Sequence, residues 1–71
     1  IGPYRFHFYS RELNEPPHIH VRRDNCEAKF WLQPISLAVN LGYNQSEINR
    51  IEGHVKEHCQ KLIDAYTEFH G

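Results

Sequence analysis

The residues best suited to chemistry are two histidines and an arginine that alternate along the stretch His18-Ile19-His20-Val21-Arg22. Because neighbouring side chains of a β-strand point to opposite faces, this spacing places the three polar side chains on one face and Ile19 and Val21 on the other. Histidine can act as base and acid because its pKa lies near 7, and arginine binds phosphate. The stretch therefore predicts a surface suited to metal-independent cleavage of RNA, in which a base deprotonates the 2′-hydroxyl.

A strand and a turn must hold this surface in place. Pro16 and Pro17 fix an extended backbone before His18, because proline locks its own φ and disfavours helix in the residue before it. Asp24-Asn25 predicts a two-residue hairpin turn, since both residues tolerate positive φ, and residues 26–32 form the next strand. The expected register pairs Arg23–Cys26, Arg22–Glu27, Val21–Ala28, His20–Lys29, Ile19–Phe30 and His18–Trp31.

The neighbouring strands are expected to add side chains to the histidine face, by which we mean the sheet face that carries His18 and His20. The alternation over Tyr4–Tyr9 predicts a first strand with Phe6 and Phe8 toward the core. Aromatic side chains on the histidine face could stack on the bases of a single strand. We predict a catalytic set of His18, His20, Arg22 and Lys29, and a substrate-binding set of Arg5, His7, Tyr9 and Trp31.

The main alternative is a solvated outer face without chemistry, in which Arg22 and Glu27 form a cross-strand pair that contributes about 0.3 kcal/mol. A histidine metal site is a third interpretation, but two imidazoles are too few for zinc, so we predict no metal and no cofactor. Residues 54–58 also match the H-x-x-E-H string of a zinc protease class, which needs a third ligand from a far larger domain. Surface histidines beside the apolar stripe of a helix explain that match better.

The second half of the chain predicts a strand and a long helix. Residues 35–41 alternate and end at Gly42, which favours a fourth strand over a short helix that starts at Pro34. Asn44 and Glu47 have the spacing of a capping box, and apolar residues then recur every three or four positions. The expected fold class is α+β, with a small antiparallel sheet of three to four strands packed against one long C-terminal helix.

The expected helix is longer than the sheet. About 25 residues at 1.5 Å each span roughly 37 Å, whereas a six-residue strand covers roughly 20 Å, so the helix overhangs unless it bends. Gly53 is the expected bend or close-contact point. An overhanging apolar end would expose Leu62, Tyr66 and Phe69. We predict that these three residues bind a partner protein, with a homodimer as a further option.

Composition bounds the class of protein. The chain has 71 residues, which indicates a single domain over residues 1–71, and its formal net charge of −1 gives no global field that attracts nucleic acid or membrane. We find no signal peptide and no apolar run near the roughly 20 residues of a membrane span, so we expect a cytoplasmic protein. Cys26 and Cys59 fit no metal motif and are expected to be free thiols. Because the chain starts at Ile1, we expect native residues to precede it.

Several segments together resemble an uncharacterised family of small prokaryotic domains, whose hallmark is a Pro-Pro-His-x-His-Val stretch. The matching segments are Phe8-Tyr9-Ser10, Glu15–Val21, Ala28–Leu32, Gly42-Tyr43 and the closing helix, and the positions that match the motif are Pro17, His18, His20 and Lys29. The resemblance covers nearly the whole chain. It implies a toxin of a type II toxin–antitoxin pair, with an antitoxin-like protein as partner. From the residue types of the histidine face we expect such a toxin to act on RNA or the translation machinery. The alternative is a non-enzymatic protein-interaction module.

Overall fold

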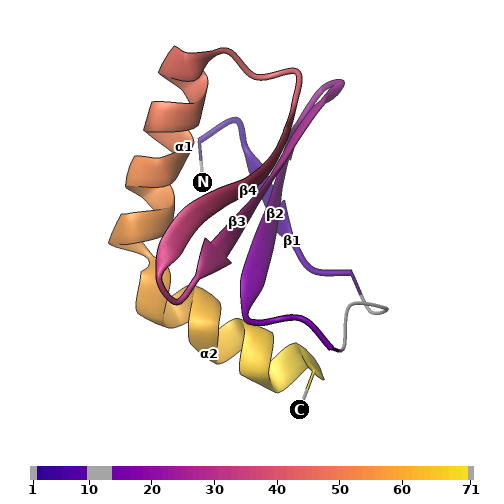
Figure 1. Cartoon of the computed structure of the whole chain (residues 1–71), viewed down its shortest axis with the longest axis vertical. Coiled ribbons are helices and arrows are strands. Elements are labelled where there is room, and N and C mark those ends of the chain that lie inside the picture. The colour runs from indigo at the N-terminus through magenta and orange to yellow at the C-terminus, as the bar shows by residue number, and fades with distance from the viewer. Residues whose placement is uncertain (1, 10–13, 71) are drawn as a thin grey trace.

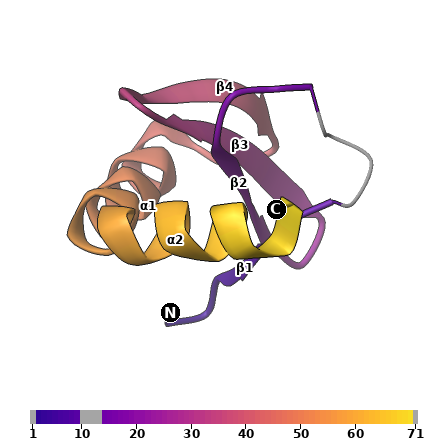
Figure 2. The same ribbon diagram turned by 90° about the horizontal axis from the view of Figure 1, so that it is seen from below.

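The computed structural model describes residues 2–9 and 14–70, which form an antiparallel sheet of four strands and two helices (Figure 1). The strands lie in sequence order: β1 (Arg5–His7), β2 (His18–Arg23), β3 (Cys26–Leu32) and β4 (Ile35–Leu41). Helix α1 (Gln45–Glu57) runs along one face of the sheet, and α2 (Cys59–His70) crosses its lower end, as Figure 2 shows from below. The fold is therefore α+β.

The β2–β3 register is the one that the sequence predicts, from Arg23 opposite Cys26 to His18 opposite Trp31. Asp24 adopts the positive φ of 54° that the two-residue turn demands. The first strand also pairs with β2, and it places Arg5 opposite Arg22 and His7 opposite His20. The sequence therefore predicted correctly which side chains of β1, β2 and β3 share the histidine face.

Residues 35–41 form the predicted strand, and the alternative short helix is wrong. The pairing of β3 with β4 shifts between Lys29 and Phe30, which leaves Ala38 as the extra residue of a bulge. Leu37 therefore lies opposite Phe30 on the helix side of the sheet, while Val39 lies opposite Lys29 on the histidine face. The bulge thus sends neighbouring apolar side chains of β4 to both faces.

The core lies between the sheet and α1. Its sheet side consists of the inward residues of β2 and β3, namely Ile19, Val21, Ala28, Phe30 and Leu32, which are all buried. The matching stripe of α1 supplies Ile48, Ile51 and Val55. Asn44 caps α1, because its side chain accepts a hydrogen bond of 2.8 Å from the backbone N–H of Glu47. Within the described ranges, neither helix is both long and apolar enough to cross a membrane.

The prediction of one long helix is wrong, because the helical segment is interrupted at His58. The backbone of His58 (φ −107°, ψ 16°) ends α1, and α2 starts at Cys59 in a new direction (Figure 1). Gly53 is not the bend, since it lies inside α1, and no other part of the described chain packs within 4 Å of where its Cβ would stand. The change of direction lets α2 contact β2 and β3, so that Tyr66 is buried against the sheet instead of overhanging it.

Candidate functional site

The two motif histidines lie on the predicted face but are not open to solvent. His18 is 0% exposed and His20 is 5% exposed. The expectation of an open imidazole pair was therefore wrong, although the register on which it rested is correct. The reason is that this face has a cover of its own, which comes from segments outside β2.

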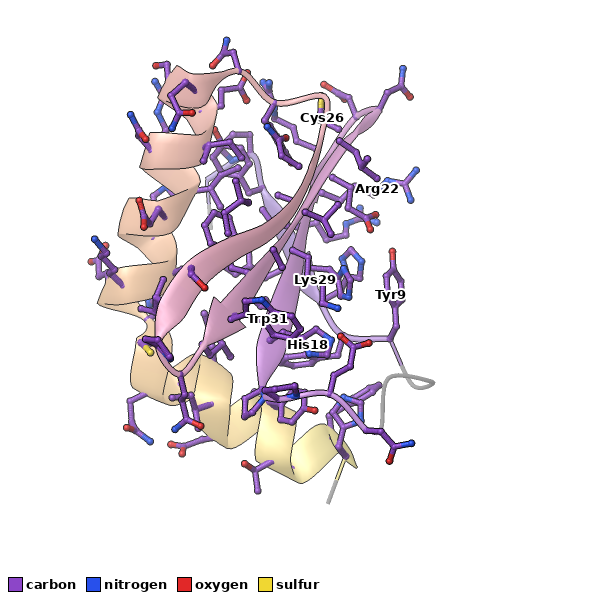
Figure 3. All side chains as sticks on the ribbon, in the orientation of Figure 1. Tyr9, His18, Arg22, Cys26, Lys29 and Trp31 are labelled. Atoms are coloured by element: carbon purple, nitrogen blue, oxygen red, sulfur yellow. The ribbon has the colours of Figure 1, made fainter. Side chains whose placement is uncertain are left out.

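His18 is enclosed by aromatic rings and by the chain before β2. Its ring centroid lies 5.7 Å from that of Trp31 and 5.5 Å from that of Tyr66. Its Nδ1 lies 2.8 Å from the carbonyl oxygen of Pro16. A carbonyl can only accept, so Nδ1 carries the proton and donates it to this hydrogen bond. His18 is thereby held in one orientation at the start of β2 (Figure 3).

Glu15 completes the cover over the lower end of the face. Its carboxylate forms an ion pair with the ammonium of Lys29, whose side chain is only 14% exposed. The Nζ of Lys29 also lies 4.6 Å from the centre of the Trp31 ring, in cation–π contact. The hydroxyl of Tyr66 donates a hydrogen bond of 2.9 Å to the backbone oxygen of Glu15. Lys29 was predicted to bind the negative charge of a substrate, but its ammonium is paired with Glu15 of the same chain.

The middle of the face holds a cluster of His7, His20, Tyr9 and Glu27. The rings of His7 and His20 are stacked, with centroids 5.7 Å apart and an angle of 18° between their planes. The ring of Tyr9 lies 4.3 Å from that of His20, and its hydroxyl donates a 3.0 Å hydrogen bond to Glu27. The Nδ1 of His20 lies 3.6 Å from a carboxylate oxygen of the same Glu27. One carboxylate therefore faces both the tyrosine and an imidazole.

The surroundings of His7 in this cluster shift its pKa. Burial lowers the pKa of His7 below its usual 6.5, and the nearby His20 and Arg22 act in the same direction. The negative charge of Glu27 and a backbone hydrogen bond with Arg5 oppose this lowering. His7 is therefore neutral at pH 7. Its Nδ1 is buried and has no hydrogen-bond partner among the described residues.

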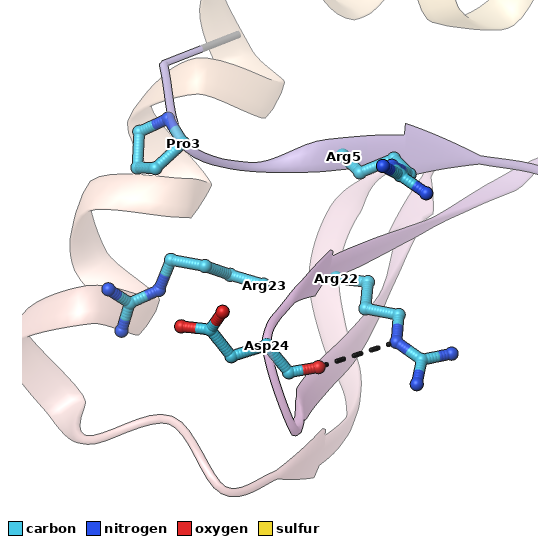
Figure 4. Close-up of a pocket in the computed structure, with 5 residues that line it drawn as sticks. All are labelled: Pro3, Arg5, Arg22, Arg23 and Asp24. Carbon is cyan, nitrogen blue, oxygen red and sulfur yellow. Dashed lines mark hydrogen bonds between the residues drawn. The ribbon is translucent and has the colours of Figure 1, made fainter.

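Two exposed arginines form a cationic corner at the end of the face beside this cluster. Arg5 and Arg22 are opposite each other on β1 and β2, and neither has a carboxylate partner within the described ranges. They line a hollow of about 300 Å³ together with Pro3, Arg23 and Asp24 (Figure 4). Arg22 donates a long 3.5 Å hydrogen bond from Nε to the backbone oxygen of Asp24, whereas Arg23 turns away and pairs with Glu47.

The structure thus divides the predicted site residues into three groups. Arg5 and Arg22 lie at the cationic corner, His7, Tyr9 and His20 form the middle cluster, and His18, Lys29 and Trp31 lie under the cover. Sequence reasoning missed the parts that Glu27 and Glu15 play. The register already placed Glu27 on this face, but Glu15 lies in a connection without periodicity, so no pattern pointed to it.

Of the three helix residues predicted to bind a partner, only Phe69 is exposed, at 51%. Leu62 packs against the core, and Tyr66 is buried with its ring against His18 and Phe8. The exposure expected of Leu62 and Tyr66 was wrong because α2 turns back across the sheet. Phe69 itself lies beside Phe8, with ring centroids 5.5 Å apart.

The H-x-x-E-H match at residues 54–58 ends at the break between the two helices. His54 lies in α1 with its ring 5.9 Å from that of Tyr4, and His58 is the residue that ends the helix. Within residues 2–9 and 14–70, no three His, Cys, Asp or Glu side chains are grouped so that they could hold a metal ion. Cys26 and Cys59 are free thiols.

The fold and the motif define a small α+β domain with a covered histidine face. Comparison with protein families shows that the chain belongs to the family of the domain of unknown function DUF4160, whose model matches residues 4–67. No curated protein matches the chain. A search of the solved structures likewise gives no match.

Proposed function

We propose that this chain is the toxin component of a type II toxin–antitoxin pair, that it acts on RNA, and that a protein partner neutralises it. The observation that carries the proposal is the cationic corner. Two arginines directly opposite on neighbouring strands repel each other, and neither forms an ion pair with a carboxylate of the described ranges, although Glu27 lies opposite Arg22 on β3. A phosphate between the two arginines would offset their repulsion, because guanidinium groups bind phosphate oxygens in a bidentate manner.

His7 is the residue that we propose as the general base. It lies two residues after Arg5 on the same strand, so both side chains belong to one face. Its lowered pKa leaves it neutral at pH 7, which is the form that accepts a proton. In the proposed reaction His7 takes the proton of the 2′-hydroxyl, and O2′ attacks phosphorus. The 5′-oxygen leaves and takes a proton from water, which yields a cyclic phosphate and a free 5′-hydroxyl.

His18, His20 and Lys29 act in this proposal as positioning residues. His20 stacks on His7 and faces Glu27, so it fixes the ring of the base. His18 and Lys29 hold the cover through Pro16 and Glu15. Their burial supports this role better than direct contact with RNA.

The proposal is tested with purified chain, labelled RNA and growth after induction. We expect Arg5→Ser with Arg22→Ser to abolish growth arrest and to weaken RNA binding more than tenfold. His7→Asn should abolish cleavage while RNA binding stays within about twofold, because Asn keeps a polar group but is no base at neutral pH. The matched control is Arg50→Ser with Lys61→Ser, which removes the same charge from exposed sites on α1 and α2. A folded Arg5/Arg22 double variant that arrests growth like the parent would overturn the proposal.

The second candidate function is a non-enzymatic protein-interaction module. The burial of both motif histidines favours it, since a closed face contributes stability without reacting. This candidate predicts no RNA cleavage by the parent chain and tight binding of a partner protein. It also predicts that Phe69→Ser, at an exposed apolar site, weakens the binding of that partner.

A further inference from the structure

Strand β4 forms a long edge of the sheet that no other strand of the described chain covers. It has seven residues, and it is the last strand in the order β1-β2-β3-β4. No charged residue occurs anywhere from Gln33 to Ser46, although 17 of the 71 residues of the chain are charged. Edge strands are usually protected from pairing by charges, proline or bulges, and β4 has only the bulge at Ala38 within its span.

Exposed apolar side chains project from β4 on both faces of the sheet. Leu37 is 43% exposed and lies opposite Phe30, on the side of the helices. Val39 and Leu41 are 43% and 60% exposed and lie opposite Lys29 and Glu27, on the histidine face. A ligand on one face would cover only part of this set. A strand added to the edge would cover both sides at once, because its own side chains alternate between the faces.

We propose that two copies of this chain pair through β4, antiparallel and about a two-fold axis near Val39, to form a continuous sheet of eight strands. A second copy fits this edge because β4 is uncharged, so that self-pairing brings no like charges together. An acidic or basic partner strand would find no complementary charge there.

The other edge of the sheet, formed by β1, favours a closed dimer over an open chain of copies. β1 has only three residues, and it starts at Arg5 of the cationic corner. A head-to-tail contact of β4 with β1 would therefore be short and would place the apolar edge beside exposed charge. Pairing β4 with β4 instead satisfies both long edges in a symmetric dimer and leaves none to recruit a third copy. The dimer places the two cationic corners at opposite ends of the sheet, and its formation does not depend on the proposed action on RNA.

The test is the mass of the purified 71-residue chain in solution, measured by size-exclusion chromatography with light scattering over a range of concentrations. We expect twice the mass of one chain. Val39→Lys should give the mass of one chain, because the two-fold axis brings the two new ammonium groups together. Leu41→Lys should raise the dimer dissociation constant more than tenfold. Hydrogen exchange at the amides of β4 should slow as the chain concentration rises, and this dependence should vanish in Val39→Lys.

Ala65→Lys is the matched control, since it adds the same charge at an exposed position of α2 and should leave the dimer intact. Circular dichroism should show that all three variants are folded. A parent chain that has the mass of one chain at every concentration would overturn the proposal. So would a dimer that survives both Val39→Lys and Leu41→Lys, or one that only Phe69→Lys dissociates, because either result places the interface elsewhere.

Discussion

The outer face of the sheet is covered over the two motif histidines of β2 and bare over β4. His18 and His20 are polar and almost completely buried, whereas Val39 and Leu41 on the same face are apolar and 43% and 60% exposed. This is the reverse of what residue type alone leads one to expect. The comparison teaches that alternation along a strand determines the face on which a side chain lies, but not whether that face meets solvent.

The difference lies in what crosses each half of the face. Three side chains reach over the histidines: Tyr9 from the segment after β1, Glu15 from the connection before β2, and Tyr66 from α2. Within the described ranges, no segment crosses β4 on that side. Ser36, which lies opposite Trp31 on β4, is exposed. The cover over the histidines therefore stabilises the fold, whereas the cationic corner and the bare β4 half are available for contacts with other molecules.

The largest expected effect on the free energy of unfolding comes from removing a buried side chain of the covered half. His18→Ala removes a fully buried ring, its contacts with Trp31 and Tyr66 and its hydrogen bond to Pro16. We expect it to lower the free energy of unfolding by about 3 kcal/mol, as other large-to-small core substitutions do. Chemical denaturation followed by circular dichroism measures this loss.

Ser36→Ala is the control for that experiment, because Ser36 lies opposite Trp31 in the same row but on the bare side. It should change the free energy of unfolding by less than about 0.5 kcal/mol. Similar small losses in both variants would contradict the distinction between the two halves.

A smaller effect is expected from the ion pair of Lys29 with Glu15. The Lys29 side chain is only 14% exposed, so a double-mutant cycle with Lys29→Met and Glu15→Gln should give a coupling energy of about 1 kcal/mol. The same cycle on Lys56 and Glu52, an exposed pair at 4.0 Å within α1, should give about 0.3 kcal/mol. Equal coupling in the two cycles would mean that the burial of Lys29 does not strengthen its pair with Glu15.

The smallest effect is a pH dependence of stability that comes from His7. Its pKa is lowered in the folded chain, so the unfolded chain binds more protons near pH 6, and stability falls as the pH drops through the usual value of 6.5. The melting temperature of the parent should therefore fall between about pH 8 and about pH 5.5. His7→Asn should reduce that fall, and thermal melts across this range measure the difference. A parallel decline in both proteins would remove His7 as the source.

The sequence contained enough information to predict which side chains of β1, β2 and β3 share a face, but not the bulge that divides the apolar side chains of β4 between both faces. Asp24-Asn25 permits only a short turn, and the apolar positions on either side of it agree in one register alone, so the pairs from Arg23–Cys26 to His18–Trp31 could be written down. Local periodicity also predicted β4 and the cap of α1 at Asn44. These features depend on residues that are close together in the chain.

The burial of the site and the break at His58 depend on contacts between distant residues, which no local pattern encodes. Tyr66 lies 51 positions from Glu15, to which its hydroxyl donates a hydrogen bond. The apolar spacing continues without interruption through His58, so periodicity predicted one helix where packing on the sheet produces two. The hollow at the cationic corner likewise forms only when β1 pairs with β2.

The most direct test of the covered histidine face is the rate at which each histidine reacts with diethyl pyrocarbonate, followed by mass spectrometry of the digested chain. His58, partly exposed at the helix break, serves as the internal reference. His18 and His20 should stay unmodified in the folded chain while His58 is modified, and all three should react alike in denaturant. If His18 and His20 react as fast as His58 in the folded chain, the face is open and the account is wrong.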